Sequence, residues 1–278
     1  MSTKQGLLFG TAGIPLSTWE PSVEAGIMRV RELGLDCMEV EFVRGVNMTP
    51  DTASATAKVA NREEIKISAH APYFINLNAR EPEKAIASRE RIIQTARITA
   101  LLGGNSVVFH AAYYLDNDPS QVYDTVRDSI ELIIDQLRTE LNSVCLRPEV
   151  MGRPSIFGTM EEILRLSAEI SGVAPTIDFS HWHARTGKAN SYPEFVAILK
   201  QIEEELGEEY LRDMHIHISG ISYGPKGEKK HTPLVESDLR YKDLLRALKT
   251  FNVTGCVICE SPNLEEDALL LQKTFEAL

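Results

Sequence analysis

Eight short apolar runs alternate with longer amphipathic segments along almost the whole chain. The runs lie at residues 6–10, 37–42, 65–70, 105–110, 143–149, 174–179, 214–219 and 255–261. Short runs rich in β-branched residues are typical of buried strands, and strands that alternate with helices form parallel sheets. This pattern therefore restricts the chain to an α/β fold.

The segments between these runs have the periodicity of amphipathic helices. They are clearest at residues 22–35, 83–103, 126–141, 160–171, 192–205 and 241–251. A doubly wound sheet would carry G-x-G-x-x-G after its first strand, and "FGTAG" does not fit that motif. Eight strand–helix units in 278 residues fit a (β/α)8 TIM barrel. We predict one TIM-barrel domain over residues 1–278.

Composition and cysteine usage point to a reducing, aqueous compartment. No run approaches the length of a membrane span, and "MSTKQGLLFG" lacks the regions of a signal peptide. The four cysteines are too few and too scattered for a disulfide scaffold. The pair in "GCVICESP" lies in a predicted strand, where alternation turns the two side chains to opposite faces. We expect a cytoplasmic monomer with no membrane partner.

The formal net charge of −11 argues against a protein that coats nucleic acid by electrostatic attraction. It leaves room for an enzyme whose metal ions and local basic loops meet the phosphates of a nucleic acid. An acidic total is also consistent with a site that is rich in carboxylate ligands. The net charge therefore argues against one class of nucleic-acid-binding protein but does not identify the function.

Residues that can bind metals occur where the predicted strands end. In a TIM barrel, the active site forms from the C-terminal ends of the strands and the loops that follow them. Six of the eight predicted strands finish with an imidazole or a carboxylate, and structural residues placed independently would be more scattered. The candidates are His70, His110, Glu149, Asp178, His181, His215, His217, His231 and Glu260. This grouping indicates a single site.

The chemistry of these side chains favours divalent metals. Carboxylates packed together raise one another's pKa and destabilise the fold unless cations neutralise them. Mixed His, Asp and Glu ligands suit zinc, with manganese or iron as alternatives. The candidates outnumber the ligands of one ion, so at least two ions are implied, with Glu149 or Glu260 as a bridge. Two ions about 3.5–4 Å apart activate water and hold a phosphoryl group.

Several candidates lie in longer motifs that appear in a fixed order along the chain. "HAPYFINLN" at residues 70–78 is similar to an H-x-x-Y-x-x-N-L motif, and "VVFHAA", "RPEV", "IDFSH" and "ICESP" follow it. With these motifs the chain resembles the endonuclease IV family of apurinic/apyrimidinic endonucleases, within the wider sugar-isomerase-like barrels. The resemblance extends from His70 to Glu260, which is nearly the whole chain.

The resemblance implies a trinuclear zinc site that cleaves duplex DNA on the 5′ side of an abasic residue, with Glu149 and Glu260 as its catalytic carboxylates. The first ion would be bound by His70, His110 and Glu149. The second would be bound by Glu149, Asp178, Glu260 and a histidine of residues 214–219. The third would be bound by His181 and His231. Tyr73 would lie near the abasic sugar after it flips out of the stack.

Two positions depart from that pattern or leave a choice. His215 and His217 point to the same face of a strand, and we prefer His217 because it is nearer the C-terminal end. The family has D-x-H after the seventh strand, whereas "GEKKHTPL" places Lys229 two residues before His231. Either Glu228 replaces the missing ligand, or the third ion is weakly bound or absent. Lys229 could instead supply positive charge against the phosphate.

Basic residues near the predicted site have two interpretations. Arg44, in "FVRGVNMTP", could reach a DNA phosphate or remain a solvated surface residue. The run "GPKGEKKH" could be a mobile basic lid over a phosphate, because its glycines permit motion, or simply a solvated stretch.

Two other functions remain open from the sequence. One is a single-metal sugar isomerase or epimerase, in which Glu149, Asp178, His217 and Glu260 resemble the metal quartet of such enzymes. The acidic charge suits this alternative, whereas the additional histidines exceed what one ion needs. The other is a protein that binds abasic or nicked DNA without cutting it.

Overall fold

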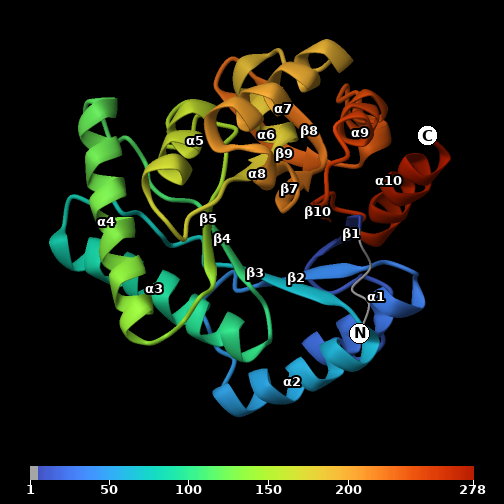
Figure 1. Cartoon of the computed structure of the whole chain (residues 1–278), viewed down its shortest axis with the longest axis horizontal. Coiled ribbons are helices and arrows are strands. Elements are labelled where there is room, and N and C mark those ends of the chain that lie inside the picture. The colour runs from blue at the N-terminus through green and yellow to red at the C-terminus, as the bar shows by residue number, and fades with distance from the viewer. Residues whose placement is uncertain (1–5) are drawn as a thin grey trace.

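Eight parallel strands form one sheet that curves into a barrel, and the helices lie outside it (Figure 1). The computed structural model describes residues 6–278. Its barrel strands are β1 (Leu7–Ala12), β2 (Cys37–Glu41), β3 (Lys66–His70), β4 (Ser106–Phe109), β5 (Cys145–Pro148), β6 (Thr176–Asp178), β7 (Met214–Ile218) and β10 (Gly255–Cys259). Their order in the sheet is β5-β4-β3-β2-β1-β10-β7-β6, and parallel bridges Leu146–Val173 and Glu149–Thr176 join its two ends. The predicted TIM barrel is confirmed.

The helices begin at recognisable sequence signals. They are α1 (Val23–Glu32), α2 (Pro50–Glu63), α3 (Pro82–Leu101), α4 (Pro119–Thr139), α5 (Met160–Glu169), α6 (Phe179–Thr186), α7 (Tyr192–Leu206), α8 (Glu208–Leu211), α9 (Tyr241–Thr250) and α10 (Glu265–Ala277). Proline stands in the first turn of four of them, where its missing N–H costs nothing, and Thr159 with Glu162 forms a capping box on α5. Within residues 6–278, no helix is long and apolar enough to cross a membrane.

The apolar core lies between the strands and the helices rather than inside the barrel. Phe9, Phe109 and Ile216 are among its fully buried members. The inside of the barrel holds a small cluster of Cys37, Cys256 and Ile258, whereas Cys259 belongs to the outer core. The predicted opposite orientation of the two cysteines on β10 is confirmed.

Polar side chains fill much of the barrel interior, where branched aliphatic residues are usual. Arg147 is 3% exposed and donates from Nε to Ser106 Oγ at 2.9 Å and from Nη2 to Asp213 Oδ2 at 2.6 Å. Ser68 donates to Glu39 at 2.7 Å, and both are buried. A buried polar group needs a partner, so this interior fixes each side chain through specific contacts.

An antiparallel hairpin, β8 (Gly220–Gly224) and β9 (Gly227–Thr232), follows β7. The run "GPKGEKKH", predicted from its glycines to be a mobile lid or a solvated stretch, is instead part of this regular hairpin. Gly227 has φ of +81°, and a Cβ at this position would lie 2.2 Å from the carbonyl oxygen of Gly152. The backbone N–H of Glu228 donates to the same carbonyl at 3.0 Å. The hairpin is therefore packed directly against the segment that follows β5.

Candidate metal centre

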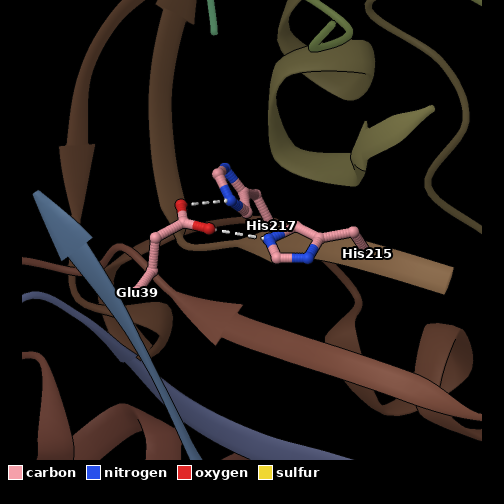
Figure 2. A group of neighbouring side chains, drawn as sticks. All are labelled: Glu39, His215 and His217. Atoms are coloured by element: carbon pink, nitrogen blue, oxygen red, sulfur yellow. Dashed lines mark hydrogen bonds and ion pairs between the residues drawn. The ribbon is translucent and has the colours of Figure 1, made fainter. Parts of the chain in front are cut away.

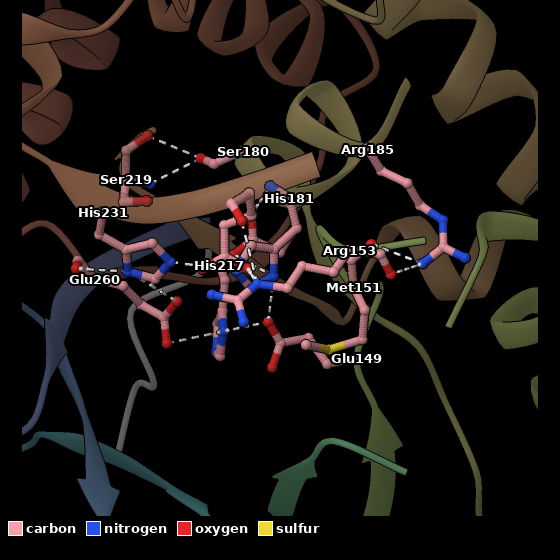
Figure 3. A network of polar contacts seen from close by, with 12 residues as sticks. Glu149, Met151, Arg153, Ser180, His181, Arg185, His217, Ser219, His231 and Glu260 are labelled. Atoms are coloured by element: carbon pink, nitrogen blue, oxygen red, sulfur yellow. Dashed lines mark hydrogen bonds and ion pairs between the residues drawn. The ribbon is translucent and has the colours of Figure 1, made fainter. Parts of the chain in front are cut away.

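The C-terminal mouth of the barrel brings together the imidazoles and carboxylates predicted from the strand ends. Figure 3 shows His181, His217, His231, Glu149 and Glu260 close to one another. Three groups at the mouth have ligand-type atoms within 4.8 Å of one another. They are His70–His110–Glu149, Glu149–Asp178–His181–Glu260, and His181–His231–Glu260. Glu149 belongs to two of these groups, and His181 and Glu260 also belong to two.

The first group is built from the ends of three neighbouring strands. Nε2 of His70 and Nε2 of His110 lie 3.3 Å and 3.0 Å from the same oxygen, Oε2 of Glu149. Nδ1 of His70 lies 2.8 Å from the carbonyl oxygen of Ala71. A carbonyl only accepts, so Nδ1 carries the proton and Nε2 of the neutral ring presents a lone pair toward Glu149.

The central group surrounds His217, which is fully buried on β7. Nδ1 of His217 lies 3.3 Å from Oε1 of Glu260 and 3.7 Å from Oε1 of Glu149. Nδ1 of His217, Oε1 of Glu149 and Oδ2 of Asp178 are buried without a hydrogen-bond partner among the described residues. Such atoms are costly unless something satisfies them, and a divalent cation would satisfy the oxygens of Glu149 and Asp178, which belong to one ligand group.

Asp178 has two functions in the local structure. Its Oδ1 caps α6 by accepting from the backbone N–H of His181 at 2.7 Å. The cap fixes the turn that places His181 three residues on, which explains the D-x-x-H spacing. The other oxygen, Oδ2, remains for the central group and lies 3.3 Å from Nδ1 of His181.

A third group forms where α6 meets the hairpin. Nδ1 of His181 and Nδ1 of His231 lie 3.2 Å from the carbonyl oxygens of Val150 and Glu260 respectively. Both Nδ1 atoms are therefore donors, and in the neutral rings both Nε2 atoms carry lone pairs. These two Nε2 atoms face each other at 3.2 Å. Oε2 of Glu228 lies 3.6 Å from Nε2 of His181. Facing lone pairs repel unless a proton or a cation lies with them.

A β-bulge explains how Glu228 comes to face His231. Ser222 pairs with Lys230 while the next residue, Tyr223, pairs with Glu228, so Lys229 is an extra residue in β9. Without the bulge, residues three apart on a strand would point to opposite faces. The extra residue places Glu228 and His231 on the same side of the hairpin, toward His181. Lys229 itself is exposed, with its side chain against Gly224.

Burial and charge act in opposite directions on the titratable groups at the mouth. Burial would lower the pKa of His70, but the hydrogen bond to Glu149 and the charge of Glu41 raise it to about 10. Burial would also raise the pKa of Glu149, but His110 and neighbouring imidazoles bring it well below its ordinary range. The carboxylates thus hold protons on the imidazoles. Bound divalent cations would replace those protons.

The predicted substrate-binding residues lie in different places. The ring of Tyr73 stacks on His110 with a centroid distance of 5.5 Å and is 46% exposed, so it lies over the first group. Burial raises the pKa of its phenol above the ordinary value, which keeps it a proton donor. Arg44 is exposed in the segment after β2, and Lys229 is exposed on the hairpin. Neither belongs to the three groups at the mouth.

Two inward-facing carboxylates of β2 were missed in the sequence. Glu39 is fully buried and contacts both histidines of β7, at 2.8 Å from Nε2 of His215 and 2.9 Å from Nε2 of His217. Glu41 has a buried oxygen without a partner among the described residues, and burial raises the pKa of Glu41 to about 8. The alternating carboxylates in "CMEVEF" were the available signal, because acids rarely alternate in a buried strand.

Comparisons with known proteins agree on the fold. The sequence profile of the family described as "Xylose isomerase-like TIM barrel" matches residues 27–278. An uncharacterized protein of Methanocaldococcus jannaschii is 45% identical over 273 residues, and the match covers 98% of each protein. A protein of Mycobacterium leprae named "Probable endonuclease 4" is 26% identical over 249 residues, which cover 87% of this chain and 92% of that protein.

A solved structure with a different description has a similar fold. A D-tagatose 3-epimerase-like protein superposes with a TM-score of 0.73 at 20% identity, over 96% of each chain. Similarity at this identity shows a common fold and no more. The chain is therefore similar both to a protein named as a probable endonuclease and to a protein named as epimerase-like, and the shared fold does not separate them.

Proposed function

This chain belongs to the family of xylose isomerase-like TIM barrels, and we propose that it is a metal-dependent endonuclease that hydrolyses the phosphodiester 5′ to abasic sites in duplex DNA. One observation carries the proposal: Glu149 lies in two ligand groups at once, and His181 and His231 form a third beside Glu228. A single ion could not use all these donors. A multinuclear centre suits phosphoryl transfer.

The donors fit divalent cations by type as well as by number. His70, His110 and Glu149 would hold one ion, and Glu149, Asp178, His217 and Glu260 would hold a second. His181, His231 and Glu228 would hold a third. Imidazole and carboxylate together suit zinc, with manganese or iron as alternatives. The buried, unpartnered atoms of His217, Glu149 and Asp178 support this assignment.

Ions bound there would supply hydroxide near neutral pH and stabilise negative charge on the phosphoryl and leaving oxygens. The chain's own residues then hold the reacting groups in position. Tyr73, partly exposed above His70 and His110, offers its ring and hydroxyl to the extruded sugar. The packed hairpin holds His231 and Glu228 against the site. Departure of the 3′ oxygen leaves a 3′-hydroxyl and a 5′-deoxyribose phosphate.

Glu228→Ala is expected to remove about one bound divalent ion per chain, because Glu228 is the carboxylate near His181 and His231 that is not also assigned to the second ion. Lys229→Ala, which changes the neighbouring exposed residue, is the matched control and is expected to keep the full metal content. Elemental analysis after dialysis at a fixed free zinc concentration measures both. Loss of the ion in Lys229→Ala, with none in Glu228→Ala, would reverse the assignment of the ligand.

A second candidate is a single-metal sugar isomerase or epimerase. Two observations favour it: the net charge of −11, and the position of Glu149, Asp178 and Glu260 in one ligand group, with His217 beside Glu149 and Glu260. A small sugar needs no basic surface, whereas duplex DNA attracts one. On this alternative, His70, His110, His181 and His231 would have no role in binding the ion. That surplus is why we prefer the nuclease.

A DNA duplex with one tetrahydrofuran abasic analogue tests the proposal. We expect a single cut on the 5′ side of the analogue when zinc or manganese is present, and no cut in the undamaged duplex. Intact strands at micromolar protein would contradict it. A parallel incubation with D-tagatose follows the second candidate, which would be supported by an epimerised product without strand cleavage. A shift in gel mobility without either product would indicate a binding protein.

A further inference from the structure

Glu39 lies below the mouth of the barrel, between the two histidines of β7. Figure 2 shows its carboxylate directed at the rings of His215 and His217. The three residues are at most 3% exposed, and Oε1 and Oε2 each face a different ring, at 2.9 Å from Nε2 of His217 and 2.8 Å from Nε2 of His215. His217 is the ring that connects this cluster to the central ligand group, because its Nδ1 faces Glu260 and Glu149.

We propose that Glu39 is a positioning residue that holds His217 as its Nε2–H tautomer and so directs the Nδ1 lone pair to the central ligand group. The proposal rests on the metal centre of the proposed function and is independent of whether DNA is the substrate. The contact between Oε1 of Glu39 and Nε2 of His217 lacks the alignment of a hydrogen bond, but a negatively charged oxygen 2.9 Å away attracts that nitrogen only when it carries a proton. Nδ1 is then the unprotonated atom, which is the form that binds metal.

The remaining contacts of Glu39 keep its carboxylate in place. Oε2 accepts from the hydroxyl of Ser68 at 2.7 Å and lies within hydrogen-bond distance of Nε2 of His215. Hydrogen bonds from Ser68 and His215 thus hold Oε2 of Glu39, while Oε1 faces His217 as an ion-pair contact. The two histidines thus have different positions. His217 faces the central ligand group, whereas His215 lies one layer deeper in the barrel and holds Glu39 in place.

The same three residues could be considered a metal site of their own, since their ligand-type atoms lie within 4.8 Å. The contacts argue against it. Oε2 of Glu39 already accepts hydrogen bonds from Ser68 and from His215, and Oε1 faces His217 at 2.9 Å. An ion would have to displace these pairs in a fully buried position. Positioning of His217 accounts for the geometry without that displacement.

Glu39→Gln provides the test, because it keeps the size of the side chain. The amide has one accepting oxygen and one donating nitrogen, so it cannot accept from His215 and His217 at the same time. We expect the metal affinity of the central site to fall about 10–100-fold. In ¹⁵N spectra of histidine-labelled protein, His217 should lose the Nε2–H form in the variant. Competition with a chromophoric chelator measures the affinity.

Glu41→Gln is the matched control, because it removes another inward carboxylate of the same strand and leaves Glu39 in place. It is expected to keep the His217 tautomer. Ser68→Ala keeps the carboxylate of Glu39 and removes one of its hydrogen bonds. It should lower the metal affinity less than Glu39→Gln does, so it provides a second test if Glu39→Gln folds poorly. An unchanged His217 tautomer in Glu39→Gln would overturn the inference. A wild-type chain that binds no metal would refute the proposed function instead, while the tautomer comparison still decides the role of Glu39.

Discussion

Glu149→Ala is expected to abolish phosphodiester cleavage, with a loss of about 10³-fold or more, and to remove more than one bound ion per chain. The reason is the position of its two oxygens. Oε2 faces His70 and His110, while Oε1 lies 2.9 Å from Nδ1 of His181 and also faces His217. One carboxylate thus completes two ligand groups, and its loss should disable both.

The matched control for Glu149→Ala is Glu131→Ala, which deletes an exposed carboxylate on α4. It should retain both cleavage and metal content. Cleavage of the abasic duplex and elemental analysis are measured on both variants, with circular dichroism to confirm the fold. Glu149→Ala protein that is folded and still cleaves at more than a tenth of the wild-type rate would contradict the role given to Glu149.

Removal of divalent ions is expected to make stability fall as the pH rises from about 6 to about 9. The pKa of His70 is raised from 6.5 to about 10, so its stabilising proton is fully bound below 6.5 and is lost as the pH rises through 10. The pKa of Glu41 is raised from 4.5 to about 8, so its contribution is also lost as the pH rises. Glu149, whose pKa is lowered, titrates below this range.

Bound ions should reverse this dependence, because they take the lone pairs that protons otherwise occupy and bind more tightly as protons leave. We expect the difference in Tm between zinc-loaded and chelated protein to grow by roughly 5–10 °C between pH 6 and pH 9. Thermal unfolding in both states across this range measures it. Glu41→Gln should reduce the loss of stability of the chelated protein between pH 6 and pH 9. Equal pH profiles with and without zinc would contradict the account.

The barrel could be predicted from the sequence because its signals are local. Each strand is a short apolar run, and several helices begin at proline or at a capping residue, so neither needs knowledge of distant contacts. The candidate ligands could also be predicted from the sequence, because parallel strands in a barrel end at the same face. Residues as far apart as His70 and Glu260 therefore meet at one mouth.

The parts that could not be predicted depend on contacts between distant segments. The hairpin is held by the close approach of Gly227 to Gly152, and a strand of "GEKKHT" has no apolar alternation to indicate it. The role of Glu228 depends on the bulge at Lys229, which has no sequence signature of its own. Glu39 and Glu41 were visible as an unusual pair, but their partners on β7 are set by the closure of the barrel.

The choice between His215 and His217 also depends on contacts between distant segments. Both point inward, and the preference for His217 rested on its position nearer the end of the strand. The structure places His217 beside Glu260 and Glu149, and His215 beside Glu39. The assignment of His217 as the ligand remains a proposal, now supported by these distances.

A multinuclear metal centre can be checked by counting the divalent ions that the purified chain binds. We expect two or three ions per chain, retained through dialysis and measured by elemental analysis against protein concentration. We base this number on Glu149, which belongs to two ligand groups, and on His181, which faces His231. A chain that retains only one ion, or none, after incubation with zinc and with manganese would contradict the multinuclear centre and the nuclease proposed from it.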